Sequence, residues 1–242
     1  MDGRGTPALA LNLPSRGGRN QWKTAAGAGT GSLALALLKR VAPAGTVTAL
    51  DADARFLRPL AADKLVVVEA DLAETTLPVD RYELVHARLV LEHLPRRHAV
   101  LAALTAAVRP GGWLLIEDFD WSTALVIDPP DATHDRVARA CLQVLTAGGY
   151  DPYYGRTLPR RLHEAGLVEV GTHAESVQVR ADAERGLPQS ELLVEQLAPA
   201  LLAHGLVEDS DLVRFRELWH DGTTVCVAPL MISTWGRRPR SS

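Results

Sequence analysis

The sequence has few cysteines and no pattern of metal ligands. Its 242 residues include only two cysteines, Cys141 and Cys226, which lie far apart and outside any zinc-ligand spacing. This excludes a disulfide framework and gives no sign of a metal site. A reducing compartment fits such cysteine usage, so we expect a cytoplasmic protein that holds no metal.

An excess of positive charge and long hydrophobic runs are also absent. The formal net charge is -3 and the sequence pI is about 6.2, so the chain lacks the positive field that binds nucleic acid or anionic lipid. No apolar run reaches the roughly 20 residues that cross a bilayer, and no basic region followed by an apolar segment opens the sequence. We therefore expect a small-molecule substrate, with no nucleic-acid or membrane partner. The oligomeric state stays open.

The order of the predicted elements indicates an α/β fold. Hydrophobic residues make up 47% of the sequence and charged residues 23%, as in globular proteins. Short apolar segments alternate with segments of helical periodicity, which predicts βαβ units and a mostly parallel sheet. Predicted strands span residues 46–50, 65–70, 82–86, 113–117, 167–179 and 223–235, and predicted helices span residues 32–41, 54–62, 95–108, 131–146 and 158–165.

The chain divides into an arm, a core, an insertion and a tail. The arm is rich in Gly, Pro and Arg, and we expect it to be disordered or divergent. The mostly helical insertion is a candidate lid over the sheet edge where ligands bind. The basic cluster Arg237, Arg238 and Arg240 is expected to be a solvated tail. The boundaries are 1–24 for the arm, 25–182 and 222–236 for the core, 183–221 for the lid and 237–242 for the tail.

A glycine-rich turn at residues 27–31 lies where a first strand should meet a first helix. Closely spaced glycines let the backbone approach a ligand, and the helix N-terminus beyond offers unpaired N–H donors. Asp51 ends the next strand twenty residues after Gly31, where a carboxylate can accept both ribose hydroxyls of an adenosyl group. The alternatives are a tight turn without a ligand and an aspartate that only caps the following helix.

The spacing of the glycines disfavours a dinucleotide. The dinucleotide fingerprint is G-x-G-x-x-G, and here the sixth position is Ser32 while Gly31 takes the fifth. The sequence also has no Tyr-x-x-x-Lys pair of the short-chain type. A nicotinamide-dependent oxidoreductase is therefore the less favoured hypothesis.

Five segments match a known family in its order: GAGTG at 27–31, TALDAD at 48–53, EADLAE at 69–74, YELVHARLVLEHLP at 82–95 and RPGGWLLIEDFD at 109–120. On these segments the chain resembles the class I S-adenosylmethionine-dependent methyltransferases, and within them the small-molecule branch. The resemblance implies a doubly wound, Rossmann-like α/β fold whose seven-stranded sheet is mostly parallel with an antiparallel final strand. It also implies S-adenosylmethionine as cofactor and in-line methyl transfer to an O, N or C nucleophile of a small molecule.

Carried over by position, the same resemblance assigns the cofactor contacts. The glycine turn would pass beneath the methionine and ribose portions, Asp51 would hold the ribose, and Asp71 would accept from the adenine amino group. For Asp71 the alternative is a loop residue that caps a turn. The implied contacts are Gly27, Ala28, Gly29 and Gly31 in the turn, Asp51 and Ala52 after the second strand, Asp71 and Leu72 after the third, and Ala87 and Arg88 after the fourth.

A general base is needed only where the acceptor must lose a proton, and His93 is the candidate. A hydrogen-bonded core histidine is the alternative for His93 and the expectation for His86. Glu92 lies four residues after Arg88, so a surface ion pair would also explain it. Asp118 and Asp120 are further candidate acids or bases, for which loop hydrogen bonding is the alternative.

Two features depart from the family pattern. A buried strand usually precedes the glycine turn, and an acidic residue usually lies two positions before the first glycine. Here residues 20–26 read NQWKTAA, which places Ala25 at the acidic position. We expect no buried strand there and no carboxylate for the methionine pocket, so the N-terminus would be truncated, divergent or translated in a wrong frame. The alternative function is a degenerate S-adenosylmethionine-binding protein without catalysis.

Overall fold

The computed structural model describes residues 22–124, 126–182, 184 and 188–240. A seven-stranded sheet with the strand order β3-β2-β1-β4-β5-β10-β7 forms its centre. The first five strands are parallel, and β10 runs antiparallel to both of its neighbours. This confirms the predicted doubly wound, mostly parallel sheet with an antiparallel final strand. The strands are β1 (Trp22–Ala26), β2 (Thr46–Asp51), β3 (Leu65–Glu69), β4 (Tyr82–Arg88), β5 (Val108–Asp120), β7 (Val168–Glu175) and β10 (Leu230–Arg237).

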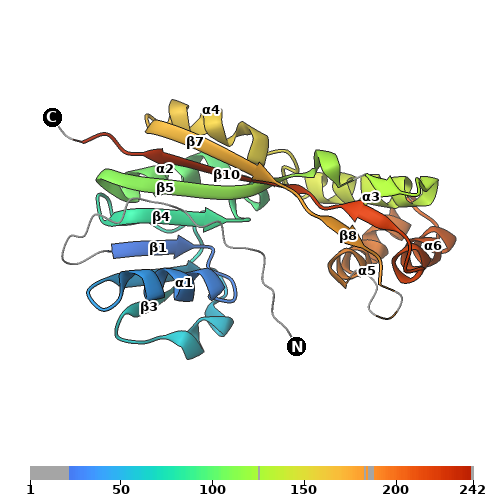
Figure 1. Ribbon diagram of the computed structural model, residues 1–242, viewed down its shortest axis with the longest axis horizontal. Coiled ribbons are helices and arrows are strands. Elements are labelled where there is room, and N and C mark those ends of the chain that lie inside the picture. Colours follow the sequence, from blue (N-terminus) through green and yellow to red (C-terminus); the bar gives the residue numbers. More distant parts are fainter. Residues whose placement is uncertain (1–21, 125, 183, 185–187, 241–242) are drawn as a thin grey trace.

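Helices cover both faces of this sheet because successive strand residues point to opposite sides. Ala25 packs in a cluster with α1 (Ser32–Val41), and its neighbour Ala26 packs in another with α2 (Arg97–Ala107) and α4 (Leu158–Glu164). The arrows of β1 and β4 point toward a second, mostly helical part of the molecule (Figure 1). The carboxyl edge of the sheet therefore faces that part.

The existence of β1 corrects the sequence prediction. β1 begins at Trp22 and lies in the middle of the sheet between β2 and β4, so residues 22–24 belong to the core rather than to an arm. The polar side chains are accommodated because the buried Thr24 Oγ1 donates to the carbonyl of Thr48 at 3.0 Å and Lys23 is only half-buried. Residues 1–21, the rest of the predicted arm, lie outside the described chain.

One predicted helix is also replaced. Residues 54–62 form two short 3-10 turns, η1 (Ala54–Phe56) and η2 (Arg58–Leu60), in place of a continuous helix. The physical reason is Pro59, which has no backbone N–H to donate within a longer helix. Asp53 caps the first turn by accepting from the Arg55 amide at 3.1 Å.

The second part, which we call the helical lobe, extends beyond the predicted lid. It has its own hydrophobic core, and α3 and three short strands join the two inserted helices in it. The predicted strands 167–179 and 223–235 are interrupted at residues 176–177 and 228–229. Each of them therefore contributes one strand to the large sheet and one to the lobe. The lobe comprises β6 (Ile127–Asp128), α3 (Ala132–Ala147), β8 (Gln178–Arg180), α5 (Pro188–Ala203), α6 (Asp209–His220) and β9 (Val225–Val227).

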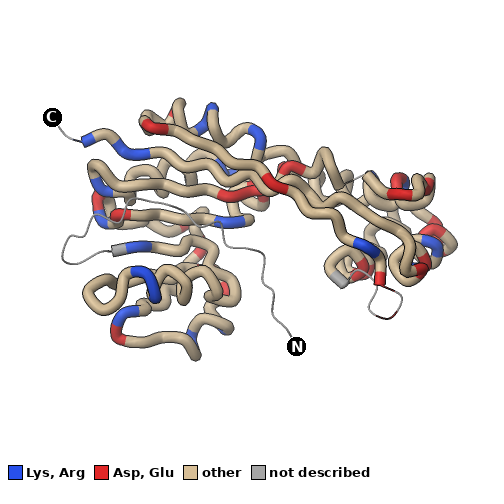
Figure 2. The backbone as a smooth tube through the Cα atoms, viewed as in Figure 1, with Lys and Arg blue, Asp and Glu red and all other residues tan. Residues whose placement is uncertain are grey.

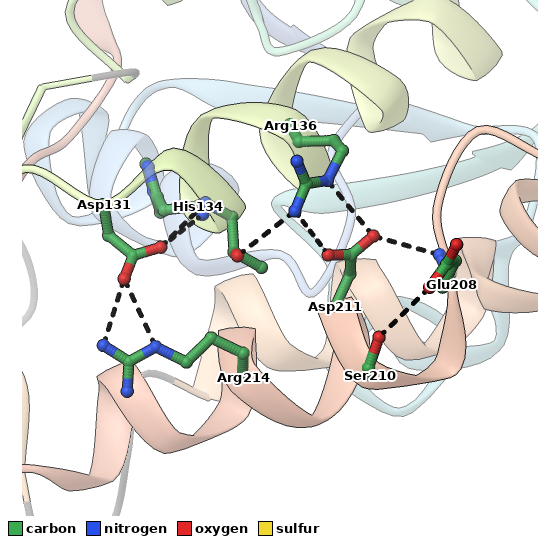
Figure 3. A network of polar contacts seen from close by, with 8 residues as sticks. Asp131, His134, Arg136, Glu208, Ser210, Asp211 and Arg214 are labelled. Atoms are coloured by element: carbon green, nitrogen blue, oxygen red, sulfur yellow. Dashed lines mark hydrogen bonds and ion pairs between the residues drawn. The ribbon is translucent and has the colours of Figure 1, made fainter.

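Ion pairs tie α3 to α6 within the lobe (Figure 3). Asp131 caps α3 by accepting from the amide of His134 at 3.0 Å, and its second oxygen accepts from Arg214 of α6 at 3.0 Å. Arg136 donates to both oxygens of Asp211, at 3.1 and 2.6 Å. These contacts hold the two helices against each other at the lobe core.

Two of the three C-terminal arginines correct the expectation of a solvated tail, whereas Arg240 is exposed. Arg237 belongs to β10 and pairs with Glu169 at 3.0 Å, while Arg238 pairs with Asp80 and donates to the Ala106 carbonyl at 2.8 Å. Lys and Arg alternate with Asp and Glu along both parts of the molecule (Figure 2). No helix in the described ranges is long and apolar enough to cross a membrane.

Candidate functional site

The glycine turn adopts a conformation that explains its composition. Gly27, Gly29 and Gly31 have φ values of +67°, +53° and +81°, in the left-handed region that favours glycine. A Cβ on Gly27 would lie 2.2 Å from Val90 Cγ2, and one on Gly31 would lie 2.5 Å from Leu60 Cδ1. A Cβ on Gly29 would meet nothing within 4 Å. Packing therefore requires two of the glycines, whereas Gly29 borders open space at the sheet edge.

Asp51 lies against this turn. Its Oδ2 accepts from the Gly29 amide at 2.7 Å and its Oδ1 accepts from the Asp53 amide at 3.0 Å. Since β1 and β2 are parallel neighbours, their carboxyl ends meet at one edge. The glycine turn and the carboxylate predicted to hold a ribose are thus on the same side of the sheet, and Ala52 is exposed beside them.

The third pair of predicted contacts follows β3. Asp71 is exposed and its Oδ1 accepts from the Ala73 amide at 2.8 Å, which is the turn-capping contact considered as an alternative. Leu72 is buried and packs into the core. Both residues lie at the same carboxyl edge as Asp51, because β2 and β3 are parallel neighbours.

The fourth pair ends β4. Ala87 is buried, and Arg88 is half-buried at the last position of the strand. The next residue, Leu89, has a φ of +54°, which is unfavourable for a branched side chain and marks a strained bend at this edge. The bend places Val90 against Gly27, so the β4 loop and the glycine turn pack together.

A buried polar chain that sequence reasoning missed lies beside Ala25. Its strand neighbour His86 is 1% exposed, and His86 Nε2 lies 2.7 Å from Glu117 Oε2. Ser233 donates to the other oxygen of Glu117 at 2.6 Å. Burial raises the pKa of Glu117, but the His86 contact, the Ser233 hydroxyl and the Arg88 charge together hold that pKa below its usual value. The region near Ala25 therefore contains an ionised carboxylate, and His86 is the hydrogen-bonded core residue that was expected.

Glu92 and Asp118 form a second buried group. Both are 1% exposed or less. Glu92 Oε2 accepts from the Phe119 amide at 2.6 Å, and Asp118 Oδ1 accepts from the Val90 amide at 3.0 Å. Burial, and then the charge of Glu92, raise the pKa of Asp118 well above its usual value, which favours the protonated form of that carboxyl. Glu92 is an interior residue here rather than half of a surface ion pair.

His93 lies at the exposed end of this group, on η3 (Leu91–His93). Its side chain is 56% exposed, its Nε2 lies 3.4 Å from Glu92 Oε1, and its ring centre lies 4.9 Å from that of Tyr150. A buried carboxylate thus faces one imidazole nitrogen of an accessible histidine. The arrangement can hold the ring in one orientation.

Asp120, by contrast, has hydrogen-bond partners at both of its carboxylate oxygens. Both of its oxygens accept from Arg156 of η5 (Gly155–Thr157), at 2.5 and 2.6 Å, and it caps η4 (Trp121–Thr123) through the Ser122 amide at 3.0 Å. These contacts hold the pKa of Asp120 below its usual value despite burial. The loop hydrogen bonding considered from the sequence accounts for this aspartate.

The sequence profile of the methyltransferase domain matches residues 26–170. The chain belongs to the class I S-adenosylmethionine-dependent methyltransferase family. Two curated relatives are methyltransferases str2 and str3 of Strobilurus tenacellus, which are 35% identical over 132 residues and 29% identical over 155 residues. These matches cover 54% and 64% of this methyltransferase-family chain but only 48% and 53% of the relatives, so the matched region spans about half of their length.

Solved structures share the fold at low sequence identity. A Bacillus halodurans protein superposes with a TM-score of 0.60 at 16% identity, covering 92% of this chain and 94% of the other. A Haemonchus contortus phosphoethanolamine N-methyltransferase 2, solved with phosphomonomethylethanolamine and S-adenosylhomocysteine, superposes with a TM-score of 0.58 at 13% identity, covering 93% of this chain and 50% of the other. At these identities the likeness establishes the fold of this methyltransferase-family member.

Proposed function

We propose that this chain binds S-adenosylmethionine at the carboxyl edge of β1, β2 and β4 and directs its methyl group to an O, N or C nucleophile of a small molecule. The observation that carries the proposal is the contact of Asp51 with the Gly29 amide, 2.7 Å long. It brings a ribose-binding carboxylate and an open glycine turn to one edge. The family membership of residues 26–170 supports the same chemistry.

The residues at this edge suit the proposed cofactor. Gly29 presents backbone without a side chain to open space, and the Asp51 carboxylate lies beside it. Glu117 supplies a buried negative charge for the cationic methionyl end, a role that Ala25 cannot fill. The proposed contacts are Gly27, Ala28, Gly29 and Gly31, then Asp51, Ala52, Asp71 and Leu72, then Ala87, Arg88 and Glu117.

The protein residues contribute alignment and proton handling. Bound S-adenosylmethionine supplies a methyl group already activated by its sulfonium. The chain holds the acceptor in line with that methyl and excludes water, and positioning of this kind lowers a barrier by about 7 to 11 kcal/mol in favourable cases. For an acceptor that must lose a proton, His93 takes it on Nδ1 while Glu92 holds Nε2, which lies 3.4 Å from Oε1.

Calorimetry with S-adenosylhomocysteine tests the cofactor site. The wild-type chain should bind it, and Asp51→Asn should weaken binding about 10- to 100-fold, the range for a lost charged hydrogen bond. Asp53→Asn is the matched control because Asp53 is exposed and pairs with Arg55. Equal affinity of both variants would refute the site. Binding together with no transfer of labelled methyl to any of a broad panel of small acceptors would favour the degenerate binding protein.

A further inference from the structure

A cavity in the helical lobe opens next to the carboxyl edge of the sheet. It has a volume of about 220 Å³ and lies between α3, α5, α6 and the small sheet. Phe119, from the end of β5, and Trp121, from η4, line it on the side of the sheet.

The described residues that line this cavity carry no formal charge at neutral pH. Among the lining residues that the structure describes there is no Asp, Glu, Lys or Arg. Burial lowers the pKa of His134, which keeps the imidazole neutral. Burial also raises the pKa of the Cys141 thiol to about 11 and raises that of Cys226. A charged group brought here would lose its hydration without compensation, so the cavity selects against phosphates, carboxylates and ammonium groups.

Aromatic rings and one unused donor define the rest of its chemistry. The rings of His134 and Phe215 stack with centres 5.7 Å apart, and Trp219 meets both edge-on at 5.6 Å. Trp219 is 1% exposed, yet its Nε1 has no hydrogen-bond partner in the described part of the chain. A buried donor without a partner costs free energy that a ligand oxygen can recover.

The cavity adjoins the candidate base. The Phe119 amide donates to Glu92, whose other oxygen faces His93. Trp121 Nε1 donates to the hydroxyl of Tyr150, whose ring lies against His93. The same two residues therefore form a cavity wall and contact Glu92 and Tyr150, the neighbours of His93.

We propose that this cavity is the acceptor site and that the acceptor is a neutral, ring-containing molecule with a hydrogen-bond-accepting oxygen directed at Trp219 Nε1. The inference rests on the proposed methyl transfer. A dry cavity of about 150 Å³ holds benzene, so 220 Å³ admits a single substituted ring. The charge-free walls exclude the phosphorylated acceptor class named for the Haemonchus neighbour.

Three ring probes test the proposal by calorimetry in the presence of saturating S-adenosylhomocysteine. Methyl benzoate is neutral and carries acceptor oxygens, toluene lacks them, and benzoate is charged. We expect methyl benzoate to bind at least tenfold more tightly than benzoate. Trp219→Phe, which keeps a ring but removes the N–H, should weaken the binding of methyl benzoate about three- to tenfold and leave the affinity for toluene unchanged. Equal binding of benzoate and methyl benzoate, or an unchanged affinity in Trp219→Phe, would overturn the proposal.

A filling variant gives an independent test should Trp219→Phe fold poorly. Ala138→Phe adds a ring to the cavity wall and should abolish methyl benzoate binding, whereas Val213→Phe, at a 53% exposed position of α6, should not. Undiminished binding to Ala138→Phe would also contradict the proposal. Both variants should bind S-adenosylhomocysteine as the wild type does. If the wild-type chain itself does not bind S-adenosylhomocysteine, the proposed function is refuted. The experiment therefore distinguishes failure of the proposed acceptor site from failure of the proposed function.

Discussion

The amide of Gly29 donates to Oδ2 of Asp51 at 2.7 Å, across the carboxyl edge of two parallel strands. The carboxylate that we assign to the ribose thus also holds the glycine turn in shape. Its second oxygen accepts from Asp53, so both oxygens already point at backbone donors of this edge. Such contacts preorganise a site, because the group is oriented before a ligand arrives.

Alanine substitutions at different glycines of the turn should have different effects on stability and on cofactor binding. Gly27→Ala places a Cβ 2.2 Å from Val90 Cγ2 and should destabilise the fold by about 2 to 4 kcal/mol, from overpacking plus the left-handed backbone. Gly29→Ala meets no neighbour and should cost only about 1 to 2 kcal/mol from its backbone conformation. Urea unfolding measures both values. Calorimetry should then show that Gly29→Ala loses more affinity for S-adenosylhomocysteine than its small stability loss explains, and equal unfolding midpoints would contradict this account.

Asp118 should make stability depend on pH. Its pKa is raised in the folded chain above the ordinary value of 3.8, so the folded state keeps a proton that the unfolded state releases. The contribution of Asp118 to stability is complete below that ordinary value and is lost as the pH rises through the folded pKa. Asp118→Asn should therefore gain stability relative to the wild type as the pH rises above the ordinary value of 3.8, as followed by thermal unfolding. The exposed Asp63→Asn is the control, and a difference from wild type that stays constant with pH would rule the explanation out.

Glu117 should matter for cofactor affinity. Glu117→Gln removes the buried negative charge and should weaken S-adenosylhomocysteine about tenfold, as for a lost charged hydrogen bond. Ser233→Ala removes only one partner, whose oxygen lies 2.6 Å from Glu117, and should have a smaller effect. Calorimetry at pH 7.5 distinguishes them. An affinity that is the same in Glu117→Gln and wild type would mean that the carboxylate serves folding alone.

The same carboxylate gives a second pH dependence of opposite sign. The pKa of Glu117 is lowered in the folded chain from its ordinary 4.5, so its stabilisation is present above that value and is lost as the pH falls through the folded pKa. Acid unfolding of the wild type against Glu117→Gln should show curves that approach each other below about pH 4.5. Parallel curves down to pH 2 would contradict a lowered pKa.

His93 should affect transfer but not cofactor binding. With an acceptor that must lose a proton, His93→Gln should lower kcat about 10²- to 10⁴-fold, the usual contribution of a general base. Affinity for S-adenosylhomocysteine should remain, because the side chain is 56% exposed and lies on the acceptor side of the loop. His163→Gln, at an exposed position near the end of α4, is the control. A full-rate His93→Gln enzyme with such an acceptor would remove the residue from the mechanism.

The sequence predicts best those features that depend on residues close together in the chain. The turn at 27–31 and Asp51 were predictable because glycine spacing and the end of an apolar strand are read within a few residues. β1 was missed because the Asn, Gln and Lys among residues 20–26 argue against a buried strand. In the fold Lys23 is only half-buried, and the Thr48 carbonyl satisfies the Thr24 hydroxyl. The sequence shows polar side chains but not the hydrogen-bond partners that compensate for their burial.

Non-local pairing explains the other omissions. Glu117 contacts His86 and Ser233, which lie 31 and 116 residues away in the chain, so no short pattern could reveal the group. The available signal was the two-residue period of a strand, which points Glu117 to the same face as Leu115. In the same way, α3 has an ordinary amphipathic pattern, and nothing local shows that its apolar face packs in the lobe rather than on the sheet.

The carbonyl of Ala228 accepts two hydroxyls, Thr123 Oγ1 at 2.8 Å and Ser176 Oγ at 2.6 Å. Three of the segments that join the large sheet to the lobe, at residues 123, 176 and 228, are therefore held together at one oxygen, and separating them would remove its donors. We therefore expect molecules to reach the lobe cavity through local opening of α5 while the small sheet stays in place. Amide hydrogen exchange should accordingly be faster along α5 than in β8 and β9. Opening of one helix, rather than a hinge motion of the whole lobe, would then set the rates at which molecules enter and leave the cavity.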